Sequence, residues 1–352
     1  MIHGFSYDIN PGRILFGPGT VDAVAAEIGR LGAKRALILS TPFQRADAQK
    51  LAGQLGPLAC GVFSEAAMHT PVAVTLKALD AFETAQADCV VALGGGSTIG
   101  LGKAIAWRND APQIVIATTY AGSEVTPILG QTESGIKTTV RDPKILPEVV
   151  IYDPTLTTGL PVPMSVTSGL NAMAHAVEGV YARDRNPVSS LMAVEGVRAL
   201  RDALRVIVND PGDLPARSEA LYGSWLCGSV LGTVGMSLHH KLCHTLGGSF
   251  DLPHAETHAI VLPHSAAYNA LAAATELQPL ADLFGGTIGG GLYDFASSLG
   301  APLALRDLGL KEAQLDQAAD LAVRNPYWNP RPVEREAVRA LLQRAWEGTR
   351  PE

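Results

Sequence analysis

Five continuous apolar runs constrain the fold more than any other feature of this chain. They lie in the first 154 residues, at 13–17, 35–40, 89–96, 113–119 and 148–154. Short apolar runs without polar alternation are typical of parallel strands that are buried on both faces. Several of the runs are separated by segments with apolar residues at helical spacing. The pattern therefore predicts an α/β fold with a mostly parallel sheet between helices, and a polar hairpin is expected within 125–147.

The character of the chain changes near residue 158. A stretch with three prolines, residues 152–163, follows the last predicted strand, and nearly every later segment has apolar residues at helical spacing. We therefore expect two domains, an α/β domain in residues 1–158 and an all-helical domain in residues 159–352.

The composition of the chain argues against several classes of function. The net charge of −7 argues against a broad nucleic-acid surface, which would need clustered Lys and Arg. The four cysteines form no CxxC pair, as expected of thiols in a reducing compartment. The first 13 residues lack the apolar core of a signal peptide, and no apolar run is long enough to span a membrane. We expect a cytoplasmic protein that binds neither nucleic acid nor membrane.

A glycine loop follows the third apolar run. Gly94, Gly95, Gly96 and Ser97 connect that strand to a predicted helix. Glycines let a pyrophosphate approach the backbone, and a helix N-terminus offers free N–H groups and a favourable dipole. The loop matches neither GxGxxG nor the GK[ST] ending of a P-loop, and glycines can also serve a tight turn through packing alone. Dinucleotide binding is the interpretation that we favour.

A second polar loop strengthens this interpretation. Thr118, Thr119 and Ser123 follow the fourth apolar run, and ligands of open α/β sheets bind outside the carboxyl ends of the strands. After the second run, Ser40 and Thr41 stand where an acidic residue would bind the ribose of NAD. Without a carboxylate to repel a 2′-phosphate, we expect the site to accept NADH or NADPH.

Histidines concentrate in the helical domain. Seven of the nine lie between 175 and 264. His240 and His244 are one helical turn apart, as are Asn171 and His175, so each pair shares a helix face. We expect a catalytic pocket built from His175, His240, His244 and His254, whereas His258 and His264 are interpreted as structural.

Several motifs in one order resemble the iron-containing alcohol dehydrogenase superfamily. They are FGPGT (16–20), GGGS (94–97), TTYAGSEVT (118–126), GLNAMAHAVE (169–178) and the histidine-rich segment 239–264. The 94–106 and 118–128 segments and NPYWNPRPV (325–333) are similar to maleylacetate reductases in particular. The resemblance implies a dehydroquinate synthase-like fold, a homodimer, and NAD(P)H-dependent reduction of the C=C bond of maleylacetate to 3-oxoadipate in the degradation of aromatic compounds.

The superfamily's metal site takes an Asp and three histidines. Those positions map to Asn171, His175, His240 and His254. A neutral amide is a weak donor for a dication, so no metal is expected, in line with the resemblance to maleylacetate reductases, which work without one. Three histidines and an amide could still hold Zn²⁺ weakly. Another departure is Gly100, where metal-dependent relatives commonly place an Asp.

The expected mechanism combines the two halves of the chain. The nicotinamide is expected over Ser123 and the glycine loops, with C4 facing the histidines, and His244, then His254, is the preferred group to polarise the oxo group or protonate the enolate. Side chains expected to bind the dicarboxylate substrate or close its pocket are Asn171, Lys241, Tyr327, Trp328, Asn329 and Arg331. The alternatives are a metal-dependent alcohol dehydrogenase, an NAD-recycling lyase and a silent nucleotide sensor.

Overall fold

The computed structural model describes residues 5–7, 10, 12–133 and 136–352. The chain divides into two compact units between Leu160 and Pro161, two residues beyond the expected boundary. Residues 9–160 are called the sheet unit here. Residues 161–352, together with the described residues 5–7, are called the helical unit.

The sheet unit contains a six-stranded parallel sheet in the order β1-β8-β5-β4-β2-β3. Its strands are β1 (Arg13–Phe16), β2 (Ala36–Leu39), β3 (Ala59–Phe63), β4 (Cys89–Gly94), β5 (Gln113–Ala117) and β8 (Val149–Tyr152). Its helices are α1 (Val24–Arg30), α2 (Arg45–Leu55), α3 (Val72–Thr84) and α4 (Gly96–Asn109). The predicted α/β architecture is confirmed.

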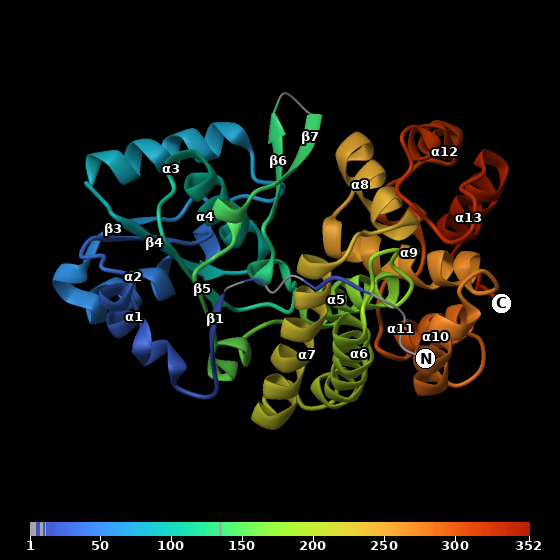
Figure 1. The fold of residues 1–352 in the computed structure, drawn as a ribbon, viewed down its shortest axis with the longest axis horizontal. Coiled ribbons are helices and arrows are strands. Elements are labelled where there is room, and N and C mark those ends of the chain that lie inside the picture. The colour runs from blue at the N-terminus through green and yellow to red at the C-terminus, as the bar shows by residue number, and fades with distance from the viewer. Residues whose placement is uncertain (1–4, 8–9, 11, 134–135) are drawn as a thin grey trace. The chain divides into compact units, whose positions relative to one another are not determined.

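Helices cover both faces of this sheet (Figure 1). On β2, Ile38 packs in a core with α1 and α2, whereas Leu37 and Leu39 pack in a second core with α3 and α4. Alternate side chains of a strand point to opposite faces, so a strand covered on both sides is apolar throughout. This double burial explains why the central strands read as unbroken apolar runs.

The polar insertion forms the expected hairpin. Strands β6 (Ile128–Glu133) and β7 (Ile136–Arg141) pair antiparallel, while residues 134–135 at the tip lie outside the described residues. The hairpin projects beside α4 in Figure 1.

Every regular element in residues 161–352, all of which the structure describes, is a helix. The α-helices are α5 (Val162–Gly179), α6 (Pro187–Ile207), α7 (Leu214–Thr233), α8 (Leu238–Phe250), α9 (His254–Asn269), α10 (Ala274–Phe284), α11 (Ile288–Ser298), α12 (Leu315–Val323) and α13 (Arg335–Glu347), and the two short 3-10 helices are η7 (Leu305–Leu308) and η8 (Glu312–Gln314). Helices α8, α9, α12 and α13 share one apolar core.

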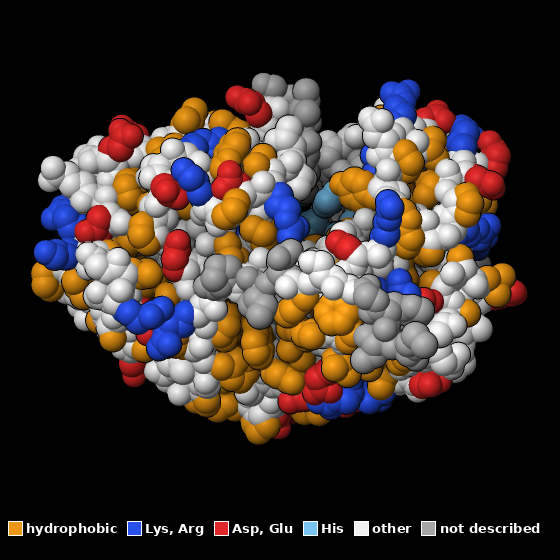
Figure 2. All heavy atoms as spheres, in the orientation of Figure 1, with side chains coloured by type: hydrophobic (Ala, Val, Ile, Leu, Met, Phe, Trp, Pro, Cys, Tyr) orange, Lys and Arg blue, Asp and Glu red, His pale blue; other side chains and the backbone are white. Residues whose placement is uncertain are grey.

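Two further observations bear on the expected partners. Acidic and basic side chains are interspersed over the face drawn in Figure 2. Among the described residues, none of the helices has the length and hydropathy that crossing a membrane requires.

Candidate functional site

The glycine loop turns tightly from β4 into α4. Gly94 has φ of 156°, and a Cβ there would lie 2.5 Å from Thr98 Oγ1. A Cβ on Gly95 would lie 2.6 Å from Thr119 Cγ2, whereas one on Gly96 would meet nothing within 4 Å. Helix α4 begins at Gly96, and the N–H groups at the very start of a helix have no acceptor within that helix. The loop fits a pyrophosphate group.

The loop after β5 adjoins the glycine loop. Thr118 N donates to Gly94 O over 3.1 Å, and Thr118 Oγ1 accepts from Gln44 Nε2 over 3.1 Å. The turn then passes through Gly122, which has φ of 78°, before it reaches Ser123. Strands β4 and β5 are neighbours in the sheet, so the predicted residues of both loops come together at one sheet edge.

Ser40 and Thr41 follow β2, which pairs with β4. Ser40 is fully buried, and its hydroxyl donates to Ser64 Oγ over 2.9 Å. Thr41 is only partly buried. Thr41 is therefore the residue of this pair that a ribose can reach, and the expected direct contact from the Ser40 side chain does not fit this burial.

Gly100, one turn after the start of α4, packs against Thr70. A Cβ at position 100 would lie 2.3 Å from Thr70 Oγ1, and Thr70 is a buried residue with φ of 45°. A β-branched residue in this region is strained and stiff. The Asp of metal-dependent relatives would therefore require Thr70 to move.

In the helical unit, α5 and α8 bring the predicted histidines together. His175 Nδ1 lies 2.9 Å from His240 Nε2, and both side chains are at most 4% exposed. Asn171, one turn before His175, is also buried, and its Oδ1 has no hydrogen-bond partner among the described residues. An orphaned buried acceptor next to an imidazole pair marks a polar site.

Glu178 organises this pair, although the sequence analysis did not single it out. Its fully buried carboxylate accepts from His240 Nδ1 over 2.7 Å. It also accepts from the backbone N–H groups of Ser237 (2.8 Å) and His239 (2.6 Å) at the start of α8. Because an ionised carboxylate only accepts, His240 carries its proton on Nδ1. When His240 is neutral, its Nε2 then accepts from Nδ1–H of His175.

His244 lies one turn after His240 and is only partly buried. Its Nδ1 is 3.1 Å from Tyr327 Oη, and Lys241 Nζ lies 5.8 Å from the centroid of the Tyr327 ring. Burial lowers the pKa of Lys241 and raises that of Tyr327. The structure thus brings Tyr327 and Lys241 close to His244, which is more exposed than the other two histidines of α8.

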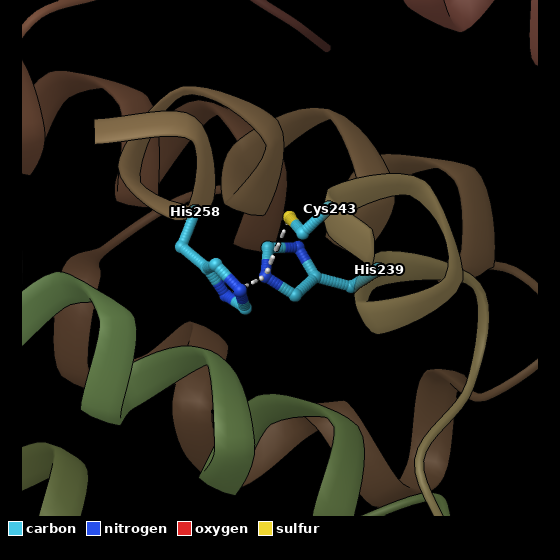
Figure 3. Close-up of side chains that lie close together, drawn as sticks. All are labelled: His239, Cys243 and His258. Atoms are coloured by element: carbon cyan, nitrogen blue, oxygen red, sulfur yellow. Dashed lines mark hydrogen bonds between the residues drawn. The ribbon is translucent and has the colours of Figure 1, made fainter. Parts of the chain in front are cut away.

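A second histidine group lies deeper, with its three side chains pointing toward one another (Figure 3). His239 Nε2 is 2.9 Å from His258 Nδ1 and 3.6 Å from Cys243 Sγ. His239 Nδ1 is 3.0 Å from Ser265 Oγ. Burial, reinforced by the neighbouring histidines, pushes the pKa values of His239 and His258 well below the ordinary range. His254 is joined to this group by ring packing on His258, at 4.4 Å between centroids.

The two histidine groups differ in the donor sets that they offer to a divalent metal. In the superfamily positions, Asn171 is neutral, and the ring nitrogens of His175 and His240 face each other instead of converging on an ion. The deeper atoms of His239, Cys243 and His258 lie within 4.8 Å of one another, but the two imidazoles already share a hydrogen bond. A cation held by His239, Cys243 and His258 would replace the hydrogen bond between the two imidazoles.

Two residues predicted to bind substrate, Asn329 and Arg331, make contacts with other residues of the protein. The Asn329 amide accepts from Leu238 N (3.4 Å) and Asn269 Nδ2 (2.9 Å), and it donates to Asn269 Oδ1 and Arg331 O. All four of its hydrogen-bonding positions are occupied. The guanidinium of Arg331 stacks 4.1 Å from the Tyr268 ring centroid. Arg331 also donates to Tyr268 O over 3.2 Å, so its guanidinium is held at this part of α9, and its role in substrate binding stays a prediction.

Two functional candidates escaped the sequence analysis for different reasons. Glu178 follows His175 by three residues and so shares its helix face, a signal that was available. Lys103 is buried under the loop after β5. Its helix also carries Arg and Asn, so the sequence did not indicate that the Lys103 side chain is buried.

The comparisons with known proteins agree with these features. Residues 11–154 match the iron-containing alcohol dehydrogenase family, and residues 165–346 match the C-terminal part of that family. The chain is 67% identical to a maleylacetate reductase of Rhizobium sp. (strain MTP-10005), over 99% of both chains. It is 52% identical to one of Burkholderia cepacia, over 99% of this chain and all of the other.

Solved structures give the same result. The crystal structure of maleylacetate reductase from Agrobacterium tumefaciens superimposes with a TM-score of 0.96 at 66% identity, covering 99% of this chain and 100% of that one. The chain therefore belongs to the iron-containing alcohol dehydrogenase family and, within it, groups with the maleylacetate reductases.

Proposed function

We propose that this chain reduces the C=C bond of maleylacetate to give 3-oxoadipate, with NADH or NADPH as the reductant and without a bound metal. The identity of 67% to a maleylacetate reductase over nearly the whole chain supports the reaction. The single observation that carries the metal-free part is Asn171, a neutral amide with an orphaned buried oxygen at the position of the superfamily's acidic ligand.

The sheet unit binds the cofactor. The backbone of Gly94, Gly95 and Gly96 and the start of α4 would hold the pyrophosphate, joined by Ser97, Thr118, Thr119 and Ser123. Thr41, which brings no negative charge to the end of β2, leaves room for a ribose with or without a 2′-phosphate. A bound nicotinamide supplies the hydride.

Side chains of the helical unit would stabilise the negative charge that develops on the substrate. When hydride adds to one alkene carbon, the electron pair of the C=C bond moves into the adjacent carbonyl, and an enolate forms until the other carbon takes a proton. Hydrogen bonds from imidazoles stabilise such a delocalised anion without a Lewis acid. His244 is the first candidate for the proton donor because it is partly exposed and lies beside Tyr327 Oη. His254, also partly exposed, is the second.

Substrate binding needs a cation for two carboxylates. Lys241 lies three residues before His244 on α8 and is partly buried, so it is the candidate. Asn171 would donate a hydrogen bond through Nδ2 where a metal ligand would otherwise stand. The pair of His175 and His240, backed by Glu178, would hold the neighbouring oxygen atoms.

The test is an NADH oxidation assay with maleylacetate, with EDTA present and no metal added, in parallel with metal analysis of the purified protein. We expect one NADH consumed per maleylacetate, 3-oxoadipate as the product, and the same rate with and without EDTA. NADPH should also be oxidised.

Two other outcomes would favour the competing functions. Loss of activity in EDTA that Zn²⁺ or Fe²⁺ restores would indicate a metal-dependent dehydrogenase. Turnover of substrate without net loss of NADH would indicate a lyase that recycles its cofactor.

A further inference from the structure

Lys103 is a buried cation for which the proposed chemistry has no use. It lies on α4, two turns after the glycine loop, and is 1% exposed. Its Nζ donates to Thr126 Oγ1 and to Ile128 O, each over 3.0 Å, and to Ser123 O. An ammonium group has three donors, so these acceptors use all of them.

All three acceptors belong to the segment that runs from the loop after β5 to the first residue of β6. This segment includes Ser123 and η4 (Ser123–Val125), and it continues the loop that carries Thr118 and Thr119. Thr126 Oγ1 also donates to Ser123 O over 2.9 Å. The backbone is therefore wrapped around the ammonium group, and α4 is tied to the second loop through one side chain.

The surroundings make this cation costly to keep. Glu124 is the charged group that faces Lys103, but its Oε1 accepts from Tyr152 Oη over 2.8 Å, and its Oε2 has no partner among the described residues. Burial lowers the pKa of Lys103 to about 7, and the Glu124 charge opposes this only in part. A lysine retained at such a cost needs a reason that an apolar side chain would not satisfy.

We propose that Lys103 is the positioning residue of the nucleotide site: its ammonium group fixes the backbone from Ser123 to Ile128, and through it the hydroxyl groups of Thr118, Thr119 and Ser123 that would bind NADH. This inference rests on the proposed nucleotide site but not on the identity of the oxidised or reduced substrate.

The loop should respond to pH. A neutral amine has two donors and a lone pair, so one of the three oxygens loses its hydrogen bond and meets a lone pair. The loop is then held less firmly as the pH rises through the pKa of Lys103, about 7. Glu124 from η4 and Tyr152 from β8 are the titratable groups on the elements near Lys103. Both are present in the unchanged protein and in a Lys103 variant, so they contribute equally to the pH dependence of the two.

The experiment measures NADH binding by the fluorescence of NADH, without maleylacetate, from about pH 6 to about pH 8.5, a range that brackets this titration. NADH is used because the 2′-phosphate of NADPH itself titrates near pH 6. The Kd of the unchanged protein should rise with pH. Lys103→Met should raise the Kd about tenfold at the acidic end and remove most of its pH dependence.

Lys77→Met is the matched control, since Lys77 lies on α3 with a side chain that is 66% exposed. It should leave the Kd unchanged. Thr126→Val removes one acceptor and keeps the lysine, so it should move the Kd in the same direction by a smaller factor. It also tests the proposal should Lys103→Met fail to fold.

At saturating NADH, Lys103→Met should leave the KM for maleylacetate within about twofold of the unchanged protein, a difference of less than 0.5 kcal/mol. Equal losses in NADH binding and in the KM for maleylacetate would point to general unfolding and overturn the inference. NADH binding as tight as in the unchanged protein, in both variants, would also overturn it. A failure to reduce maleylacetate leaves the binding measurement intact.

Discussion

At position 171 one side-chain atom separates two kinds of chemistry. The superfamily's carboxylate would hold a dication, but the amide found here leaves a buried oxygen without a partner. His175 and His240 then bond to each other, and Glu178 supplies the negative charge one step behind them. In this chain the negative charge lies not at position 171 but on Glu178, whose contact fixes the tautomer of His240.

His244 is the residue whose loss should cost most turnover. His244→Ala should lower kcat by about 10²-fold, because general acid catalysis contributes at least that much. Tyr327→Phe, which keeps the ring and removes the hydroxyl 3.1 Å from His244, should have a smaller effect. Steady-state kinetics with NADH and maleylacetate measure both. Turnover near normal in His244→Ala would transfer the role to His254.

Glu178 should affect kcat more than cofactor binding. In Glu178→Gln the amide NH₂ must face either the His240 Nδ1–H or a backbone N–H, which sets a donor against a donor. We expect kcat to fall about tenfold or more, with a smaller change in the KM for NADH. The exposed Glu65→Gln is the control. A proportional rise in the KM for NADH would argue against a role confined to the histidines.

At the scale of elements, α6 and α7 approach so closely that backbone meets backbone. A Cβ on Gly223 would lie 2.8 Å from Gly196 O and 3.0 Å from Leu200 N. Backbone atoms cannot rotate away, so Gly223→Ala should destabilise the protein by about 1–3 kcal/mol despite the better helix propensity of Ala. Urea unfolding measures this change.

Gly53 on α2 provides the matched control for this substitution. A Cβ there meets nothing within 4 Å, so Gly53→Ala should stabilise by about 0.5–1 kcal/mol. A stabilising Gly223→Ala would show that α6 and α7 can separate freely.

The elements also differ in how well the sequence predicts them. The central strands are buried on both faces and were recognisable as apolar runs. β3 (Ala59–Phe63) was missed, because this edge strand is only partly buried and contains a glycine. The hairpin β6–β7 was predicted from its polar residues.

At the scale of the whole molecule, His264 should make folding sensitive to acid. It is fully buried, neither ring nitrogen has a partner among the described residues, and burial together with the Arg344 charge lowers its pKa to about 4. The unfolded chain binds the proton near pH 6.5. The contribution of neutral His264 to the free energy of unfolding is therefore fully present above about pH 6.5. It is lost as the pH falls toward 4, which lowers the free energy of unfolding by up to about 3 kcal/mol.

Urea unfolding between about pH 7.5 and about pH 4.5 tests this, because the window starts above the unfolded-state pKa and covers most of the interval down to the folded-state pKa. His264→Leu should remove this part of the pH dependence while carboxylate titration remains. An unchanged pH profile in that variant would exclude His264 as a source of acid sensitivity. Assembly as a homodimer and a cytoplasmic location stay predictions.

The sequence by itself determined the class of fold, the two loops at the carboxyl ends of β4 and β5, and the replacement of a metal ligand by Asn171. These features are local, because burial period, glycine and residue type can be read along the chain. Only the tertiary structure decided which side chains meet. It placed Glu178 behind His240, Lys103 under Ser123 and Ile128, and Arg331 on Tyr268. Such contacts depend on how distant segments pack, and spacing along the chain shows at most that two side chains share a helix face, as for His175 and Glu178.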